Sequence, residues 1–429
     1  MKKAVLVVPI SILILAAIVL AVFTYGQSGK EEPSAVAEDV KQDDEAQEVQ
    51  TRIVSSSGMA AGVFSLGPSG IGMEECSEGL CKTGEYYESL ESTWANPDVV
   101  GVYVRLPWDS VHTDLDTFDF TTLDHELNKA VEYNKYVSLS FSAGNDDIPE
   151  WIFTEGGVTP YEFQDGGSNL EPGQCGTRMT LGDPTDEEYQ KHYFDLIRAA
   201  GEHIQSEPEW LDSLAYFKIS GANLYTHEFR LPNNCDPACE ICNTEVWAEA
   251  GYTPEGIYQF VLNQMDVIQE VLPGKPMVYQ LIQDGLPWIN NEGDYLQADG
   301  TSSGDPVLRS VEQVEEIIRR GSEAYGPLFV VAHNGLGTMG RPNRWVINAG
   351  EKGQPTGFQT KNLGELSTPE ELQMALENLW ENTTAHYIEA YEQLIWEIGE
   401  NGNELVPDSE AEINTLEEWN QQLQSRVEN

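Results

Sequence analysis

Positive charge is scarce in this sequence. The 429 residues include 23 Lys and Arg against 72 Asp and Glu, so the formal net charge is −49. Binding to nucleic acid depends on Lys and Arg that neutralise phosphates, and we therefore expect no nucleic-acid partner. The acidic residues are spread through the predicted helices and loops and do not form one tail.

This dispersed acidity leads to a prediction about salt. A surface rich in carboxylates and poor in lysine keeps a protein hydrated and soluble in strong salt, so we hypothesise a saline habitat. The alternative is an ordinary acidic secreted protein. We expect the melting temperature to rise between about 0.1 M and about 1 M NaCl, because the Debye length falls from about 10 Å to about 3 Å. Calorimetry measures the melting temperature, and a value that does not change with NaCl concentration would contradict the hypothesis.

Several catalytic motifs are missing as well. The seven histidines include no His-x-x-x-His or His-x-Glu grouping, so we predict no catalytic metal. No glycine-rich phosphate loop follows a predicted strand, and we predict no cofactor. No Gly-x-Ser-x-Gly motif is present, which argues against a serine hydrolase of the nucleophile-elbow type.

The chain begins with a positively charged end and an apolar run, residues 4–23. This run is about long enough to cross a bilayer, and we predict a signal anchor over residues 1–26 that leaves the rest outside the cytoplasm. The alternative is a cleaved signal peptide and a secreted protein. Residues 27–51 are polar and acidic and predict a flexible linker. Residues 52–429 then form the folded domain.

The stretch that organises this domain is Val99–Trp108, an apolar, β-branched run that predicts a buried strand. It is followed by an amphipathic helix, Thr121–Asn134, and by a second apolar strand, Tyr136–Ala143. Together they form a βαβ unit, and such a crossover joins parallel strands.

This unit recurs along the chain. Strand and helix alternate about eight times, which predicts a (β/α)8 TIM barrel. Residues 335–355 are the weak point, because they contain no convincing helix between the sixth and seventh strands. The predicted strands are 60–66, 99–108, 136–143, 214–222, 276–282, 328–333, 356–360 and 385–391.

The connections differ in length at the two ends of these strands. Those before strands are short, whereas those after strands are long, as in residues 144–183, 223–252 and 283–306. In a parallel barrel all loops after strands lie at the carboxyl face, where barrel active sites are found. We therefore expect the functional site there.

All six cysteines fall in these long loops. Outside the cell an even number of cysteines favours disulfides. We expect Cys76 to pair with Cys81, and Cys175 to pair with one of three later cysteines. The alternative is a zinc site formed by Cys175 and the later three thiols. The three later cysteines are Cys235, Cys239 and Cys242.

One region resembles a known family. The segments VYVRLPWDSV, FDFTTLD and KYVSLSFSAG are similar to the second and third repeats of sugar-cleaving barrels of glycoside hydrolase clan A. The resemblance extends over about Met59 to Trp396. It implies a barrel that cleaves glycosidic bonds with two glutamates, one after strand four and one ending strand seven. The residues that carry the local pattern are Arg105, Trp108, Asp109, Phe120, Leu123 and Asp124.

The sequence departs from the family at both glutamates. After strand four, Asn223 and Glu228 are present but are not adjacent, as the family has them. Strand seven ends in Gln359 and Thr360, with no carboxylate. The family's retaining mechanism is therefore not implied for this chain.

We predict Glu228 and Glu389 as the catalytic carboxylates. In strand 387–391 the small apolar residues should face the helices, which turns Glu389 toward the barrel axis. Its alternative role is a structural ion pair with Arg105, and the alternative for Glu228 is a solvated loop acid. We expect the two carboxyl groups to lie roughly 6.5–9.5 Å apart, which implies inversion with an intervening water.

Other side chains at strand ends and in the loops after strands are candidates for sugar binding. Polar ones can hydrogen-bond sugar hydroxyls, although satisfying loop backbone is their commoner use. Flat aromatic ones can stack on sugar rings, although for a single Trp packing in the loop is commoner. The polar candidates are Arg105, Asp109, Asp146, Asn223, Gln280, His333 and Asn334, and the aromatic ones are Trp108, Trp151, Tyr225, Trp288 and Trp345.

Two functions agree with these observations. The first is a membrane-tethered glycoside hydrolase that acts on extracellular oligosaccharide or polysaccharide by carboxylate chemistry. The second is a barrel of the same ancestry that binds carbohydrate without cleaving it. A carbohydrate is the expected partner in both.

Overall fold

The computed structural model describes most of the folded domain. It describes residues 59–66, 72–76, 79–83, 91–97, 99–145, 147–164, 175–224, 228–236, 239–282, 285–296, 311–338, 340–361, 369–391 and 416–428. These residues belong to one compact unit, Val49–Asn429, and the other unit of the chain is Met1–Glu48.

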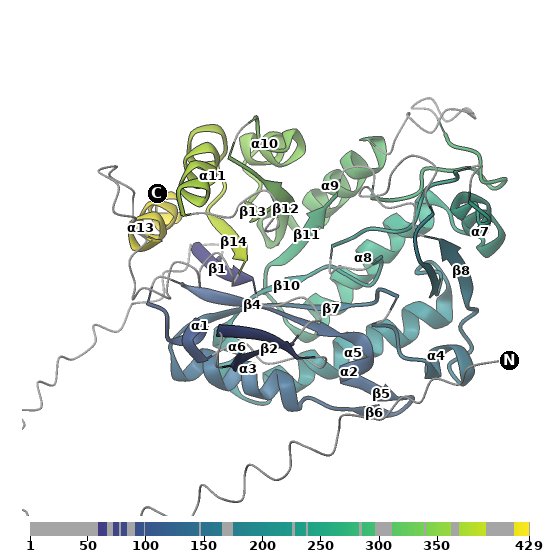
Figure 1. Ribbon diagram of the computed structural model, residues 1–429, viewed down its shortest axis with the longest axis horizontal. Helices are drawn as coiled ribbons and strands as arrows, with labels where there is room; N and C mark the ends of the chain where they lie inside the picture. The colour runs from purple at the N-terminus through teal and green to yellow at the C-terminus, as the bar shows by residue number, and fades with distance from the viewer. Residues whose placement is uncertain are drawn as a thin grey trace, which may run out of the picture. The chain divides into compact units, whose positions relative to one another are not determined.

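Eight parallel strands form a closed barrel, in the order β1-β14-β13-β12-β11-β10-β7-β4 (Figure 1). This confirms the predicted barrel with its alternating strands and helices. The barrel strands are β1 Gly62–Leu66, β4 Gly101–Pro107, β7 Tyr136–Ser142, β10 Leu214–Lys218, β11 Met277–Leu281, β12 Phe329–Leu336, β13 Thr356–Thr360 and β14 Tyr387–Tyr391.

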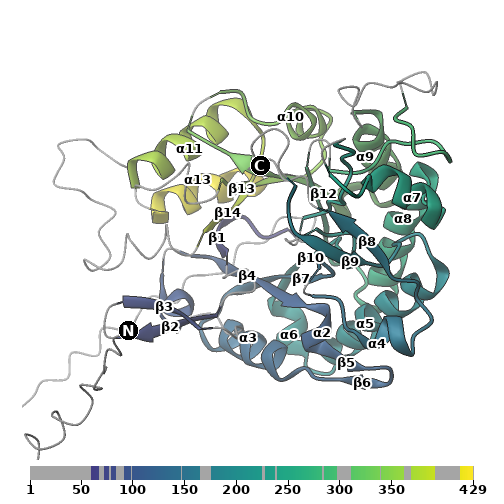
Figure 2. The same ribbon diagram turned by 45° about the vertical axis from the view of Figure 1, so that its right-hand side comes forward.

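Helices surround these strands (Figures 1 and 2). The sequence marks where two of them begin. Asp186 accepts hydrogen bonds from two backbone N–H groups of α5, and Thr253 accepts one at the start of α8, with Pro254 at the first helical position. The helices are α1 Glu91–Ala95, α3 Thr121–Glu132, α5 Glu187–Gln205, α8 Pro254–Val271, α9 Val311–Tyr325, α10 Arg344–Glu351, α11 Pro369–Asn382 and α13 Leu416–Glu428.

One helix corrects the sequence analysis. Helix α10 lies within residues 335–355, where we expected no convincing helix. Asn343 caps it by accepting from the N–H groups of Trp345 and Val346. The helix has only 8 residues, so its apolar pattern is too short to be distinctive, and burial of residues such as Trp345 stabilises it.

The loops after the strands contain structure of their own, which the sequence analysis treated as irregular. Short hairpins and helices occur in most of them, because these loops are long enough to pack side chains locally. These elements are β2 Gly72–Cys76 with β3 Gly79–Thr83, β5 His112–Asp114 with β6 Thr117–Phe118, β8 Tyr161–Gln164 with β9 Arg178–Leu181, α2 Trp108–Val111, α4 Trp151–Thr154 and α7 Asn243–Ala250. Two further short elements, α6 Pro208–Ser213 and η1 Gly326–Leu328, directly precede β10 and β12.

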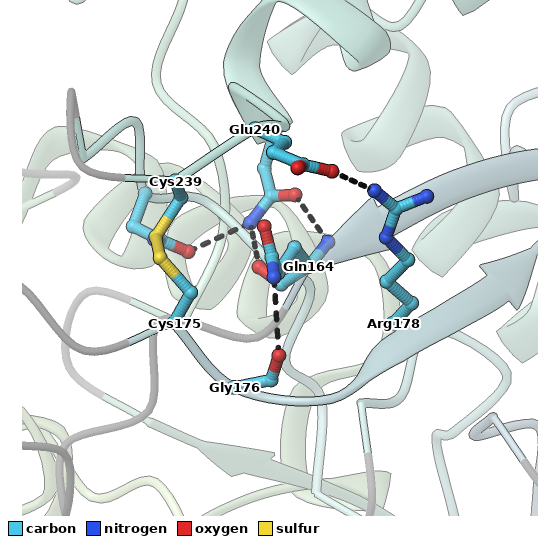
Figure 3. The surroundings of a disulfide bond; sticks show 8 residues. Gln164, Cys175, Gly176, Arg178, Cys239 and Glu240 are labelled. Carbon is cyan, nitrogen blue, oxygen red and sulfur yellow. Dashed lines mark hydrogen bonds and ion pairs between the residues drawn. A yellow bond between two sulfur atoms is a disulfide. The ribbon is translucent and has the colours of Figure 1, made fainter.

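Two disulfides join these loops. Cys175, beside hairpin β8–β9, is bonded to Cys239 in the loop after β10, and Cys235 is bonded to Cys242 within that loop. Figure 3 shows the first bond beside an ion pair of Arg178 with Glu240. The predicted pairing of Cys175 with one of the three later cysteines is confirmed. The alternative zinc site is wrong, because all four of its sulfurs are in S–S bonds. The prediction for Cys76 and Cys81 concerns side chains that lie outside the described residues.

The barrel strands are buried on both faces, as parallel strands covered by helices must be. In β4, Val102 and Val104 pack in one cluster with Leu123 of α3. The alternate residues Tyr103 and Arg105 turn into the barrel. Toward the amino ends of the strands, apolar and aromatic side chains fill the interior: Phe64, Tyr136, Tyr216, Val278, Val330, Ala332 and Tyr387.

No helix among the described residues is long and apolar enough to cross a membrane. The predicted anchor, residues 1–26, and the predicted linker, residues 27–51, lie outside the described residues.

A buried hydrogen bond joins helix α13 to β1: the N–H of Val63 donates to Asn420 Oδ1 at 2.6 Å. We expect Asn420→Ala to lower the free energy of unfolding by about 1–3 kcal/mol, because it removes an acceptor from a buried donor. Gln421→Ala, at an exposed neighbour, should change it by less than about 0.5 kcal/mol. Urea denaturation measures both, and equal losses would contradict this role of Asn420.

Candidate active site

Four polar side chains meet inside the barrel near the carboxyl ends of their strands. In each strand, the residue two positions earlier also faces the barrel interior. Because residues i and i+2 of a strand point to the same side, these four side chains point into the interior as well. All four are almost completely buried, with at most 3% of the residue exposed. They are Lys218 of β10, Gln280 of β11, Gln359 of β13 and Glu389 of β14.

Lys218 lies at the centre of their contacts. Its Nζ donates to Glu389 Oε2 at 2.5 Å and to Gln280 Oε1. It also lies 3.6 Å from the centroid of the Tyr103 ring. An ammonium has three donors and no acceptor, and two of these donors are used by Glu389 and Gln280.

The hydrogen bonds continue from Gln280 toward Glu228. Gln280 Nε2 donates to Gln359 Oε1 at 2.5 Å. Gln359 Nε2 lies 3.3 Å from Glu228 Oε1 and 3.4 Å from the hydroxyl of Tyr391. The two predicted carboxylates, Glu228 and Glu389, are therefore linked by one chain of side chains.

Each carboxylate keeps one oxygen without a hydrogen-bond partner among the described residues. Glu228 Oε2 and Glu389 Oε1 have no hydrogen bond within the described part of the chain, and neither has His333 Nδ1. Glu228 is 6% exposed and Glu389 is 1% exposed. Buried carboxylate oxygens without hydrogen bonds are unfavourable and uncommon. They mark the place where a ligand or water would be hydrogen-bonded.

Burial and charge act against each other at this ion pair. Burial raises the pKa of the Glu389 carboxyl, and the positive charges of Lys218 and Arg105 counter that rise. Burial likewise lowers the pKa of the Lys218 amine, which the Glu389 charge counters. Removing either partner would therefore favour the neutral form of the other.

His333 is also perturbed. Burial, with a smaller effect of the Lys361 charge, lowers the pKa of the His333 imidazole to about 4. Its side chain is therefore neutral at pH 7, and its Nδ1 has no partner within the described residues. A neutral imidazole can donate a hydrogen bond to one sugar hydroxyl and accept a hydrogen bond from another.

Asn223 holds the loop that carries Glu228. Its Nδ2 donates to the backbone oxygen of Glu228 at 2.7 Å. Its Oδ1 accepts from the backbone N–H groups of Ala143 and Gly221, each at 3.0 Å. These bonds connect the ends of β7 and β10, so Asn223 places Glu228 through the backbone. Residues 225–227, including Tyr225, lie outside the described residues.

The predicted tryptophans differ in their surroundings. Trp108 is fully buried and packs edge-on against Tyr189 and Tyr193. Trp151 is 8% exposed, and its indole N–H donates to the backbone oxygen of His112. Trp345 packs in α10 and is 4% exposed. Trp288 alone among these four is half-buried, which leaves part of its ring available to a ligand.

Three other predicted residues lie at or near the carboxyl ends of β4 and β12. Arg105 is buried in the barrel, and its Cζ lies 5.7 Å from the centroid of the Tyr103 ring. Asp109 is exposed in α2, and Asn334 is half-buried in β12 beside His333. Asp146 lies outside the described residues. The contacts of sugars with these side chains stay predictions.

Sequence analysis missed Lys218, and it left Gln359 and Tyr391 out of the candidate site. A signal for Lys218 was present, because it lies two residues after Tyr216 in a buried strand. The alternation that placed Glu389 inside the barrel places Lys218 there as well.

Comparisons with known proteins give a similarity of fold only. No protein-family model and no curated protein matches the chain. Among solved structures, the chain is similar to xylanase 10B from Thermotoga petrophila RKU-1 in complex with xylobiose, at 13% sequence identity and a TM-score of 0.41. The match covers 79% of this chain and 88% of the xylanase chain. The barrel architecture itself follows from the strand pairing of this chain.

Proposed function

We propose that this protein is an extracytoplasmic glycoside hydrolase that uses Glu228 and Glu389. The observation that carries the proposal is the pair of buried carboxylates in one hydrogen-bonded chain, each with an oxygen that has no partner within the described residues. Glycoside cleavage requires two such groups in unequal environments. The two disulfides support an oxidising compartment, as expected for a protein exported on an anchor or a signal peptide.

The two carboxylates have different roles in this reaction. Glu228 gives its proton to the leaving oxygen as the glycosidic C–O bond breaks. A water attacks the anomeric carbon from the opposite face and gives its proton to Glu389, which inverts the configuration. Exchange with solvent then returns both groups to their starting forms.

Two observations favour a second function. Gln359 ends the strand at which the clan A resemblance implies a nucleophilic carboxylate, and Glu389 is only 1% exposed. A barrel that binds carbohydrate without cleaving it would have both features. The predicted signal anchor, residues 1–26, would hold either protein at the cell surface.

The test is a screen of purified protein on aryl glycosides and polysaccharides. We expect the wild type to hydrolyse at least one of them and Glu228→Gln to lose activity by about 10²–10⁴-fold, because the proton donor is removed. Glu202→Gln, an exposed glutamate of α5, is the matched control and should keep wild-type activity. Sugar binding without any hydrolysis by the wild type would favour the second function.

A further inference from the structure

The hydrogen bonds of Lys218 have a fixed direction. Because an ammonium only donates, the Gln280 oxygen must point to Lys218 and the Gln280 nitrogen must point away from it. The nitrogen then donates to Gln359 Oε1. The orientation of an amide is assigned from such a network, and here a single charge sets it.

This direction extends to Glu228. With its oxygen occupied by Gln280, Gln359 presents its nitrogen to Glu228 Oε1 at 3.3 Å. Glu228 Oε1 is thereby kept as an acceptor. A proton on Glu228 belongs on Oε2, the oxygen that has no partner within the described residues.

At the other end of these hydrogen bonds, Lys218 contacts Glu389 directly. Lys218 Nζ is 2.5 Å from Glu389 Oε2, and both residues are 1% exposed. Water screens such a pair very little, so the ammonium charge has a large effect on the carboxylate. Glu389 Oε1 remains available for a ligand or water.

We propose that Lys218 is the positioning residue of this site: it holds Glu389 in its charged form and, through Gln280 and Gln359, orients Glu228 as the proton donor. This inference rests on the proposed function. Lys218 itself does not need to touch the sugar, because it acts through Glu389 and Gln280, to which it donates hydrogen bonds.

The first experiment does not depend on activity. The ¹³C carboxyl NMR signal of Glu389, assigned by its loss in Glu389→Gln, is titrated in the wild type, in Lys218→Met and in Lys352→Met. Lys352 is an exposed lysine after α10 and serves as the matched control. We expect the midpoint of the Glu389 titration to rise by about 1–3 pH units in Lys218→Met, because the positive charge beside the carboxylate is removed. In Lys352→Met this midpoint should stay unchanged.

An unmoved or lowered midpoint in Lys218→Met would overturn the proposal. Lys218→Gln keeps a hydrogen-bond donor and removes only the charge, and it provides the same comparison if Lys218→Met does not fold. A shift in Lys352→Met as large as that in Lys218→Met would also overturn the proposal, because the effect would then be general.

The second experiment uses the pH dependence of kcat/KM. Lys218→Met should move the acidic limb to higher pH, since that limb follows the ionisation of Glu389. Gln280→Leu keeps the Lys218–Glu389 ion pair but breaks the hydrogen-bonded chain to Glu228. It should lower kcat on the order of 10-fold to 100-fold, and the pH of the acidic limb should stay unchanged. A lysine that only supports the fold would lower activity at every pH without moving a limb.

The two proposals fail in different ways. If the wild type hydrolyses no glycoside, the proposed function fails, whereas the NMR midpoint still tests the action of Lys218 on Glu389. If hydrolysis is present and neither the midpoint nor the acidic limb moves in Lys218→Met, the role of Lys218 fails alone.

Discussion

Glu389→Gln should lower the rate of glycoside hydrolysis by about 10²–10⁴-fold while sugar binding persists. The amide keeps the shape of the side chain but has no negative charge to accept a proton from the attacking water. Steady-state kinetics on the best substrate from the screen measures the loss, and calorimetric titration with the same sugar measures binding.

The matched control for this loss is Glu202→Gln, which removes one of the many exposed carboxylates of the chain. Its turnover should equal that of the wild type. Unchanged turnover in Glu389→Gln would eliminate Glu389 as a catalytic residue. The ion pair with Lys218 would then be purely structural.

The second large effect concerns stability. Lys218→Met should lower the free energy of unfolding by about 3–5 kcal/mol, because it leaves the Glu389 carboxylate buried without its counter-charge. The double variant Lys218→Met with Glu389→Gln removes both charges, and we expect it to regain most of that loss. Hydrolysis should stay absent in the double variant.

Urea denaturation at neutral pH compares these variants, with Lys352→Met as the control at an exposed lysine. The coupling between the two positions is obtained from the double-mutant cycle. If the losses of Lys218→Met and Glu389→Gln simply add, the two side chains do not stabilise each other in the folded protein.

The regular elements of the barrel were predictable because their signals are local. Apolar runs such as Tyr136–Ala143 and caps such as Thr253 with Pro254 depend on residues close together in the sequence. Helix α10 and hairpins such as β8–β9 were not predictable in this way. They are short, and they are stabilised by packing and by a disulfide to a distant loop.

Part of the candidate site followed from the same local rules. Alternation along residues 387–391 turned Glu389 into the barrel, and the loop lengths indicated the carboxyl face as the functional end. The pairing of Glu389 with Lys218, 171 positions away, was not predictable, because alternation turns both side chains inward but does not say which inward side chains meet. Arg105 was the expected partner, and its charge acts on Glu389 in addition to that of Lys218.

The sequence by itself determined the order of the eight barrel strands, the face that carries the long loops, and the acidity of the chain. All of these depend on composition and on periodicity over a few residues. Only the tertiary structure decided that Lys218, Gln280, Gln359, Glu389 and Glu228 form one chain of hydrogen bonds with a single direction. Closure of the barrel brings β10, β11, β13 and β14 around a common interior, and that closure determines which distant side chains meet.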